Sequence, residues 1–246
     1  MNQHKFIKNS WSLIPLIIYI ILFLFNPIVQ KYAPIKCEQN VITFLDLWLF
    51  KDNLYTFLSN IQNSFLDVIT AIPYLFHFTL PFIYIIYLIR SKKSDESILR
   101  FLLTFGLTNM FGVLIQYCFP TPPPWMLLMD KSIPEANFFR VDTLIGFKLF
   151  KSLYAQSKLV CGAFPSLHTA WPSVIYFSGN YWIGRWFCFA HVCLIAFSAV
   201  YSMHHYLIDV VFGILLAFLS NELSRCFSFV DDGDNKEKSA FVWNDV

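Results

Sequence analysis

Long apolar stretches separated by short polar segments make up most of this chain. Six of them are long and apolar enough to suggest helices that cross a membrane: residues 11–29, 65–89, 101–119, 168–182, 186–203 and 206–223. A helix of about 20 apolar residues spans the hydrocarbon core. We therefore predict an all-α membrane protein with about six transmembrane helices. The stretch 168–182 is short for a full crossing, and 41–50 is apolar but shorter still, which predicts an interfacial helix.

The composition supports the same class of protein. Hydrophobic residues make up 57% of the 246 residues and charged residues only 14%, whereas soluble domains carry about 25% charge. The net charge is +2 and no long basic run occurs, so a nucleic-acid partner is not expected. No Cys-x-x-Cys pair or Cys/His metal spacing occurs in the sequence, and we expect neither a metal nor another cofactor.

Lysine and arginine predict the orientation in the membrane. Ten of them flank one side of the predicted spans and eight the other, but those eight lie in longer loops, where the positive-inside rule is weak. We predict cytosolic termini, so that the loop 120–163 and the turn 202–205 face the lumen or exterior. The first apolar stretch is too long for a signal-peptide core and is expected to be retained. Residues 1–223 then form one polytopic domain, and 224–246 form an acidic cytosolic tail.

Two polar motifs interrupt the apolar pattern at corresponding places. CGAFPSLHTAWPS contains His168, and YSMHHYLIDVVFG contains His205 and Asp209. The two histidines are 37 residues apart, which is the length of one helix across the membrane, a turn and one helix back. Both should therefore emerge at the same face. Asp209 follows His205 by one helical turn, where a carboxylate can accept a hydrogen bond from one ring nitrogen and make the other more nucleophilic.

The segment around His168 has features that suit a phosphate. Ser166 is placed to cap the fourth helix, whose first backbone N–H groups then point toward the predicted lumenal face. An anion-binding helix end between two histidines suits phosphoryl transfer, in which one histidine attacks phosphorus and the other protonates the leaving alkoxide. His77 and His191 are predicted to be helix-packing or cavity residues, and Asp67 and Asn109 to form interhelical hydrogen bonds.

These motifs resemble a known superfamily. FPSLH followed by HHYLID resembles the second and third signature motifs of the type 2 phosphatidic acid phosphatase superfamily. Leu167 in place of the usual glycine and the doubled histidine look most like the inositol phosphorylceramide synthase branch, and FPTPPPW at 119–125 resembles that branch's proline-rich segment. The resemblance covers roughly residues 101–223. It implies a six-helix fold without a metal, with His205 as nucleophile, Asp209 as its carboxylate partner and His168 as general acid.

The chain also departs from the phosphatase pattern. Ala199 occupies the slot of an arginine six residues before the nucleophilic histidine, and the superfamily's first motif is not present in its usual form. The phosphate charge must then be met by other groups, and we predict Arg140 first, with Lys158 and His204 as further candidates beside Ser166. These departures weaken the hypothesis of a hydrolase and favour that of a transferase.

The resemblance implies a lipid phosphotransferase of sphingolipid metabolism that moves phosphoinositol from phosphatidylinositol to a ceramide-like alcohol. The alternative is a lipid phosphate or pyrophosphate phosphatase that uses the same residues on water, and a third reading is a non-enzymatic lipid-binding subunit or transporter. A lumenal site suits the Golgi or endoplasmic reticulum. The sequence leaves open whether a small regulatory membrane subunit is bound and whether Cys37 and Cys161, both on the predicted lumenal side, form a disulfide.

Overall fold

A computed structural model describes residues 8–32, 40–127, 139–155 and 161–229 of the chain. Within these ranges the regular elements are helices, apart from an isolated bridge between Thr121 and Gly162. The all-α prediction is confirmed. In chain order the helices are η1 (Ser10–Leu13), α2 (Ile14–Tyr32), α3 (Val41–Asn60), α4 (Ser64–Phe76), η2 (His77–Thr79), α5 (Leu80–Arg90), α6 (Asp95–Cys118), α7 (Pro124–Leu127), α8 (Phe139–Ile145), α9 (Leu149–Ala155), α10 (Leu167–Phe177), α11 (Arg185–Tyr201) and α12 (Leu207–Arg225).

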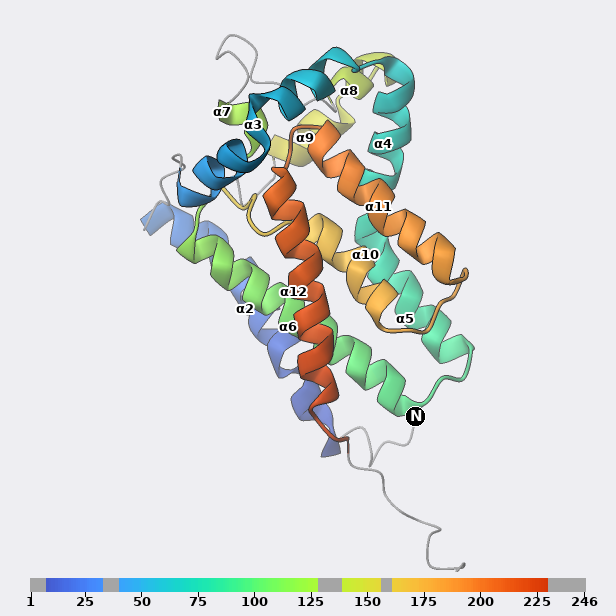
Figure 1. Cartoon of the computed structure of the whole chain (residues 1–246). Helices are drawn as coiled ribbons and strands as arrows, with labels where there is room; N and C mark the ends of the chain where they lie inside the picture. The colour runs from blue at the N-terminus through green and yellow to red at the C-terminus, as the bar shows by residue number, and fades with distance from the viewer. Residues whose placement is uncertain (1–7, 33–39, 128–138, 156–160, 230–246) are drawn as a thin grey trace, which may run out of the picture.

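Helices α6, α10 and α12 pack against one another at the centre of the bundle (Figure 1). Helix α2 lies along α6, while α11 packs against α10 and α4. The contact between α10 and α12 is especially close, because a Cβ atom added at Gly213 would overlap the carbonyl oxygen of Ser166. Ala170 on α10 and Ala217 on α12 are fully buried in the same bundle. Small residues at such positions let membrane helices approach closely.

Hydrogen bonds fix which loops share an end of the bundle. Arg100 Nη1 donates to the Ser224 carbonyl at 2.6 Å, which places the start of α6 beside the end of α12. At the other end, Gln116 Nε2 donates to the Gly162 carbonyl at 3.0 Å. Figure 1 shows α3, α7, α8 and α9 gathered at this second end. The predicted division of the loops between two ends agrees with this arrangement, and which end faces the cytosol stays a prediction.

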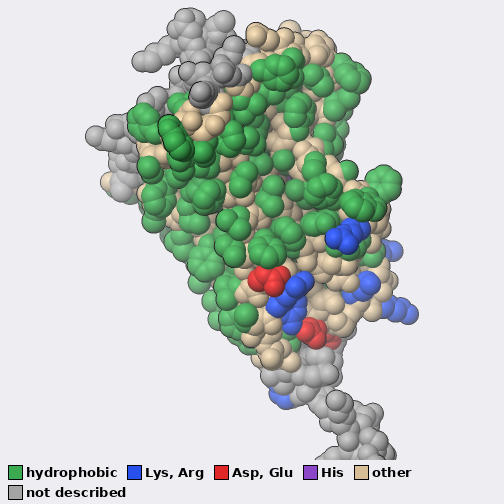
Figure 2. All heavy atoms as spheres, viewed as in Figure 1, with side chains coloured by type: hydrophobic (Ala, Val, Ile, Leu, Met, Phe, Trp, Pro, Cys, Tyr) green, Lys and Arg blue, Asp and Glu red, His purple; other side chains and the backbone are tan. Residues whose placement is uncertain are grey.

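Four helical segments are long and apolar enough to cross a membrane: Ser10–Val29, Ser64–Arg90, Asp95–Cys118 and Leu207–Arg225. Helix α10, with 11 residues, and α11, with 17, are shorter. Each of the six predicted stretches thus contains a helix, and the count of six crossings stays a prediction. Figure 2 shows apolar side chains over most of one face, with charged side chains gathered at one end. Such an apolar surface is typical of a protein solvated by lipid.

Three predicted elements differ in extent. Helix α10 ends at Phe177 rather than 182, because Gly179 follows with φ of 76°, a left-handed conformation that terminates helices. Helix α3 continues to Asn60, ten residues beyond the predicted interfacial segment. The second predicted span is interrupted by η2 between α4 and α5.

The cysteines partly address the question left open by the sequence. Cys161 is engaged in a disulfide. Among the described residues, the thiols of Cys118, Cys188, Cys193 and Cys226 are free. Cys37 lies outside the described residues, as does the part of the acidic tail from residue 230 onward, so the pairing of Cys37 with Cys161 stays a prediction.

Candidate active site

A tight turn between α11 and α12 carries the doubled histidine. Its backbone passes through a left-handed conformation at Met203, where φ is 59°. The N–H groups of His204 and His205 then both donate to the Ala199 carbonyl, at 3.1 Å each. The Met203 carbonyl accepts a hydrogen bond from the Trp125 N–H at 3.1 Å. The turn is therefore held from both α11 and the proline-rich segment.

Ser166 begins α10 as its N-cap, as predicted, and its hydroxyl accepts from the Thr169 N–H at 3.4 Å. Its own N–H donates to the Asp209 carbonyl at 2.9 Å. The Thr169 hydroxyl contacts the Val210 carbonyl at 3.4 Å. The first turn of α10 is thus bonded directly to the first turn of α12.

This junction brings the two predicted motifs together. The rings of His168 and His205 lie with their centroids 5.2 Å apart and their planes at 64°. His205 is buried, with 4% of its surface exposed. Two imidazoles in this arrangement are close enough to act on opposite sides of one small reacting group.

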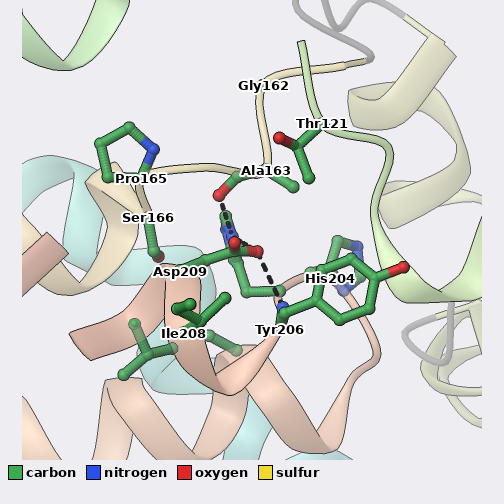
Figure 3. Close-up of polar contacts among 12 residues, drawn as sticks. Thr121, Gly162, Ala163, Pro165, Ser166, His204, Tyr206, Ile208 and Asp209 are labelled. Carbon is green, nitrogen blue, oxygen red and sulfur yellow. Dashed lines mark hydrogen bonds and ion pairs between the residues drawn. The ribbon is translucent and has the colours of Figure 1, made fainter. Parts of the chain in front are cut away.

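The hydrogen-bond partner of His205 differs from the one expected. Its Nδ1 lies 2.8 Å from the Ala163 carbonyl oxygen and 3.6 Å from Asp209 Oδ2, and only the first distance is a hydrogen bond. Asp209 Oδ2 instead accepts the Tyr206 N–H at 2.8 Å (Figure 3). Since a carbonyl only accepts, Nδ1 carries the proton and Nε2 keeps its lone pair. Ala163 fixes the tautomer, and Asp209 adds a nearby buried carboxylate.

The proline-rich segment supports Ala163. The Ala163 N–H donates to the Thr121 carbonyl at 3.1 Å, across the isolated bridge between Thr121 and Gly162. Asn40 at the start of α3 donates to the Thr121 hydroxyl at 2.9 Å, and Gln116 holds the Gly162 carbonyl. The sequence identifies the proline-rich segment only through its resemblance to a family segment, because these contacts join residues far apart in the chain.

His168 has a partner that the sequence analysis did not predict. Its Nδ1 lies 2.8 Å from Nε2 of His77, and its ring centroid is 4.5 Å from that of Tyr74. The sequence predicts His77 only as a helix-packing or cavity residue. The pattern that could have indicated otherwise is Pro81, four residues after His77, because a proline at that position disfavours a regular helix around His77.

Arg140, the first predicted phosphate ligand, is engaged elsewhere. Its Nε and Nη2 donate to the two carboxylate oxygens of Asp67 at 2.9 and 2.6 Å, and its Nη1 contacts Gln62. Tyr201 also donates to Asp67 at 2.8 Å, so the predicted interhelical role of Asp67 is confirmed. On α4, Asp67 lies about two helical turns before Tyr74, whose ring packs against His168. Lys158 lies outside the described residues.

His204 lies at the site as a neutral group. Its ring centroid is 5.6 Å from that of Tyr74, and its Nδ1 contacts the Ser202 hydroxyl at 2.8 Å. Burial, and then the charge of His205, lowers the pKa of His204 to about 3. At neutral pH it can offer a phosphate a hydrogen bond but no charge.

The role predicted for Asn109 is also confirmed, because its amide oxygen accepts the Trp171 indole N–H at 2.9 Å between α6 and α10. Within the described ranges, no group of three or more His, Cys, Asp and Glu side chains could hold a metal ion.

The fold and the paired motifs define a class of protein, and comparison with known families agrees. The model of the PAP2 superfamily matches residues 45–223, and the chain belongs to this superfamily. The resemblance predicted from FPSLH and HHYLID is thereby confirmed.

Individual relatives are more specific. The chain is 33% identical over 202 residues to the inositol phosphorylceramide synthase catalytic subunit of Schizosaccharomyces pombe, covering 77% of this chain and 46% of that one. Its Saccharomyces cerevisiae counterpart is 30% identical over a match that covers 73% of this chain and 47% of that one. The phosphoinositol dihydroceramide synthase of Bacteroides thetaiotaomicron is 33% identical, covering 62% and 53%. The chain thus spans about half the length of these relatives. No solved structure gives a significant match.

Proposed function

We propose that this protein is a membrane lipid phosphotransferase that moves phosphoinositol from phosphatidylinositol to the primary hydroxyl of a ceramide-like lipid. The observation that carries the proposal is the facing pair of His168 and His205, whose ring centroids are 5.2 Å apart. The names of the relatives, which are inositol phosphorylceramide and phosphoinositol dihydroceramide synthases, support the choice of donor and acceptor.

In the first step, Nε2 of His205 attacks phosphorus and displaces the diacylglycerol oxygen. The Nδ1–H bond to Ala163 at 2.8 Å supports this assignment, because it leaves Nε2 as the free lone pair. His168, protonated on both ring nitrogens, gives a proton to the departing alkoxide. The products are diacylglycerol and a phosphoinositol group bonded to His205.

In the second step, neutral His168 takes the proton of the ceramide hydroxyl as that oxygen attacks the phospho-histidine. The His205–phosphorus bond breaks, and the lone pair returns to Nε2. Asp209, whose Oδ2 lies 3.6 Å from Nδ1, stabilises the His205 ring whenever it carries positive charge. Each catalytic group is thus restored to its starting state.

The phosphate group would lie at the start of α10. Ser166 caps this helix, and its dipole favours an anion at that end. His204 would add a hydrogen bond. Arg140 and Lys158 stay predicted phosphate ligands, and for Arg140 the role requires donors beyond those bonded to Asp67 and Gln62.

We place the site at the lumenal face of a Golgi or endoplasmic reticulum membrane. The distribution of Lys and Arg between the two ends of the bundle supports the lumenal orientation.

The test uses purified full-length protein with phosphatidylinositol and fluorescent ceramide, without added magnesium. We expect an inositol-containing fluorescent product from the wild type. We expect none from His205→Ala, and a strongly reduced amount from His168→Ala.

Two other outcomes decide against the proposal. Phosphate released from phosphatidic acid, with no transfer product, would support the phosphatase alternative. Full activity in a cellular complementation assay by both alanine variants would instead support a non-enzymatic role.

A further inference from the structure

The second membrane segment is broken where it passes His168. Helix α4 ends at Phe76, a single 3-10 turn spans His77–Thr79, and α5 starts at Leu80. Pro81 contributes to the break, because in a regular helix its ring would clash with the carbonyl of His77, four residues earlier. A 3-10 turn inside a longer helix often marks a functional position. Here the turn presents a fully buried histidine, 1% exposed, toward α10.

The hydrogen bonds of His77 set the protons on both rings. Its Nδ1 contacts the Tyr74 carbonyl oxygen, which can only accept, so Nδ1 carries the proton. Nε2 of neutral His77 is then an acceptor. It lies 2.8 Å from Nδ1 of His168, which must be the donor. The hydrogen bonds thus form a series in which His168 donates to His77 and His77 donates to the Tyr74 carbonyl.

This order leaves Nε2 of His168 as the nitrogen that gains and loses protons. It also means that the Nδ1–H of His168 has an acceptor when the ring becomes an imidazolium. The titratable groups facing His168 are Tyr74 on α4, His77, and His204 and His205 in the turn before α12. His77 therefore occupies the place behind His168 that a carboxylate occupies behind the histidine of a Ser-His-Asp triad.

We infer that His77 is a positioning residue for the acid–base step, orienting His168 and stabilising its protonated form through the Nδ1–Nε2 hydrogen bond. This inference rests on the proposed function only for the step that His168 performs. Phe78 and Trp171 pack against the His77 ring, with centroids 4.0 and 5.9 Å away, and hold it in place. The acceptor keeps the buried Nδ1–H of His168 hydrogen-bonded whether the ring is neutral or protonated.

Two substitutions separate the hydrogen bond from simple packing. His77→Phe keeps a ring but removes the acceptor, whereas His77→Gln keeps an oxygen acceptor at about the position of Nε2. We expect His77→Phe to lower kcat about 10- to 100-fold, the range for one hydrogen bond to a charged group. We expect His77→Gln to recover most of the rate. His191→Phe, the same change at a half-buried histidine on α11, is the control and should leave the rate unchanged.

The pH–rate profile gives a readout that packing alone would not move. Without its acceptor the His168 imidazolium loses its proton more readily, so the alkaline limb of kcat/KM should move down by about one pH unit in His77→Phe. Glutamine at position 77 should restore the limb. An unshifted limb in His77→Phe, or equal impairment of both variants, would show a merely structural role and overturn the inference.

Nitrogen NMR of ¹⁵N-histidine-labelled protein tests the hydrogen bond without any substrate. In the wild type, the His168 signals, assigned from their loss in His168→Gln, should show the proton on Nδ1. A proton on Nε2 with none on Nδ1 would overturn the inference. If the wild type transfers no phosphoinositol, the proposed function fails while this measurement still decides the His77–His168 bond. Should His77→Phe fail to fold, the NMR measurement on the wild type still tests the inference.

Discussion

Replacing Gly213 by alanine is a sensitive test of how the two histidine motifs are held together. Gly213 lies on α12, and its missing side chain is what allows α10 to approach. An added Cβ would overlap the Ser166 carbonyl oxygen and lie 2.6 Å from Thr169 Oγ1. The Thr169 hydroxyl can rotate, but the Ser166 carbonyl belongs to the backbone of the helix cap and cannot.

The size of the effect follows from these contacts. Ordinary Cβ contacts begin at 3.4 Å, so clearing the Ser166 carbonyl oxygen requires α10 to move away from α12 by about 1.2 Å. Overpacking of this kind costs about 1–3 kcal/mol of stability. The same shift separates His168 from His205, and a misplacement of about 1 Å can cost about 100-fold in rate. We therefore expect Gly213→Ala to reduce kcat far more than its loss of stability explains.

Gly106→Ala provides a matched control. A Cβ at Gly106 would lie 2.6 Å from the backbone nitrogen of Leu16, which is a similar clash between α6 and α2, away from the histidines. Both variants should show a lower melting temperature in detergent. Only Gly213→Ala should lose about 100-fold in the transfer assay. Equal activity of the two folded variants would refute the claim that the α10–α12 contact sets the histidine spacing.

Three further predictions concern the surroundings of the site. Buried Asp46 accepts the Ile208 N–H at 2.9 Å and binds the Tyr55 hydroxyl, so Asp46→Ala should lower the free energy of unfolding by about 1–2 kcal/mol; an unchanged denaturation midpoint would contradict this. Arg140→Met should cost about 2 kcal/mol of stability by leaving the buried Asp67 carboxylate without its cation, whereas a raised KM at unchanged stability would favour phosphate binding instead. The pKa of His204 is lowered from 6.5 to about 3 in the folded protein, so below pH 6.5 the unfolded chain binds a proton that the folded protein does not. The free energy of unfolding should therefore fall as the pH falls below 6.5, by up to about 1.4 kcal/mol per pH unit. His204→Gln should flatten this acid dependence in denaturation curves at pH 5 and 7, and an unchanged slope would count against it.

The sequence determined the features that depend on local chemistry and on length. Long apolar segments require helices in lipid, because backbone groups must be satisfied within the segment. Ser166 was recognisable as a cap because capping involves only the next three residues. The 37 residues between His168 and His205 implied a common depth because the rise per helical residue is nearly constant.

Tertiary structure decided the partners of these histidines. Ala163, 42 residues before His205 in the chain, accepts the Nδ1–H that the i, i+4 spacing had assigned to Asp209. His77 is 91 residues from His168, and its partner is set by a helix break and by packing that no local pattern encodes. Arg140, a solitary cation in the sequence, is paired with Asp67, 73 residues away. Spacing along the chain therefore located the reacting groups, but the packing of distant helices selected the hydrogen bonds that set their protons, because such bonds depend on distances of a few tenths of an ångström.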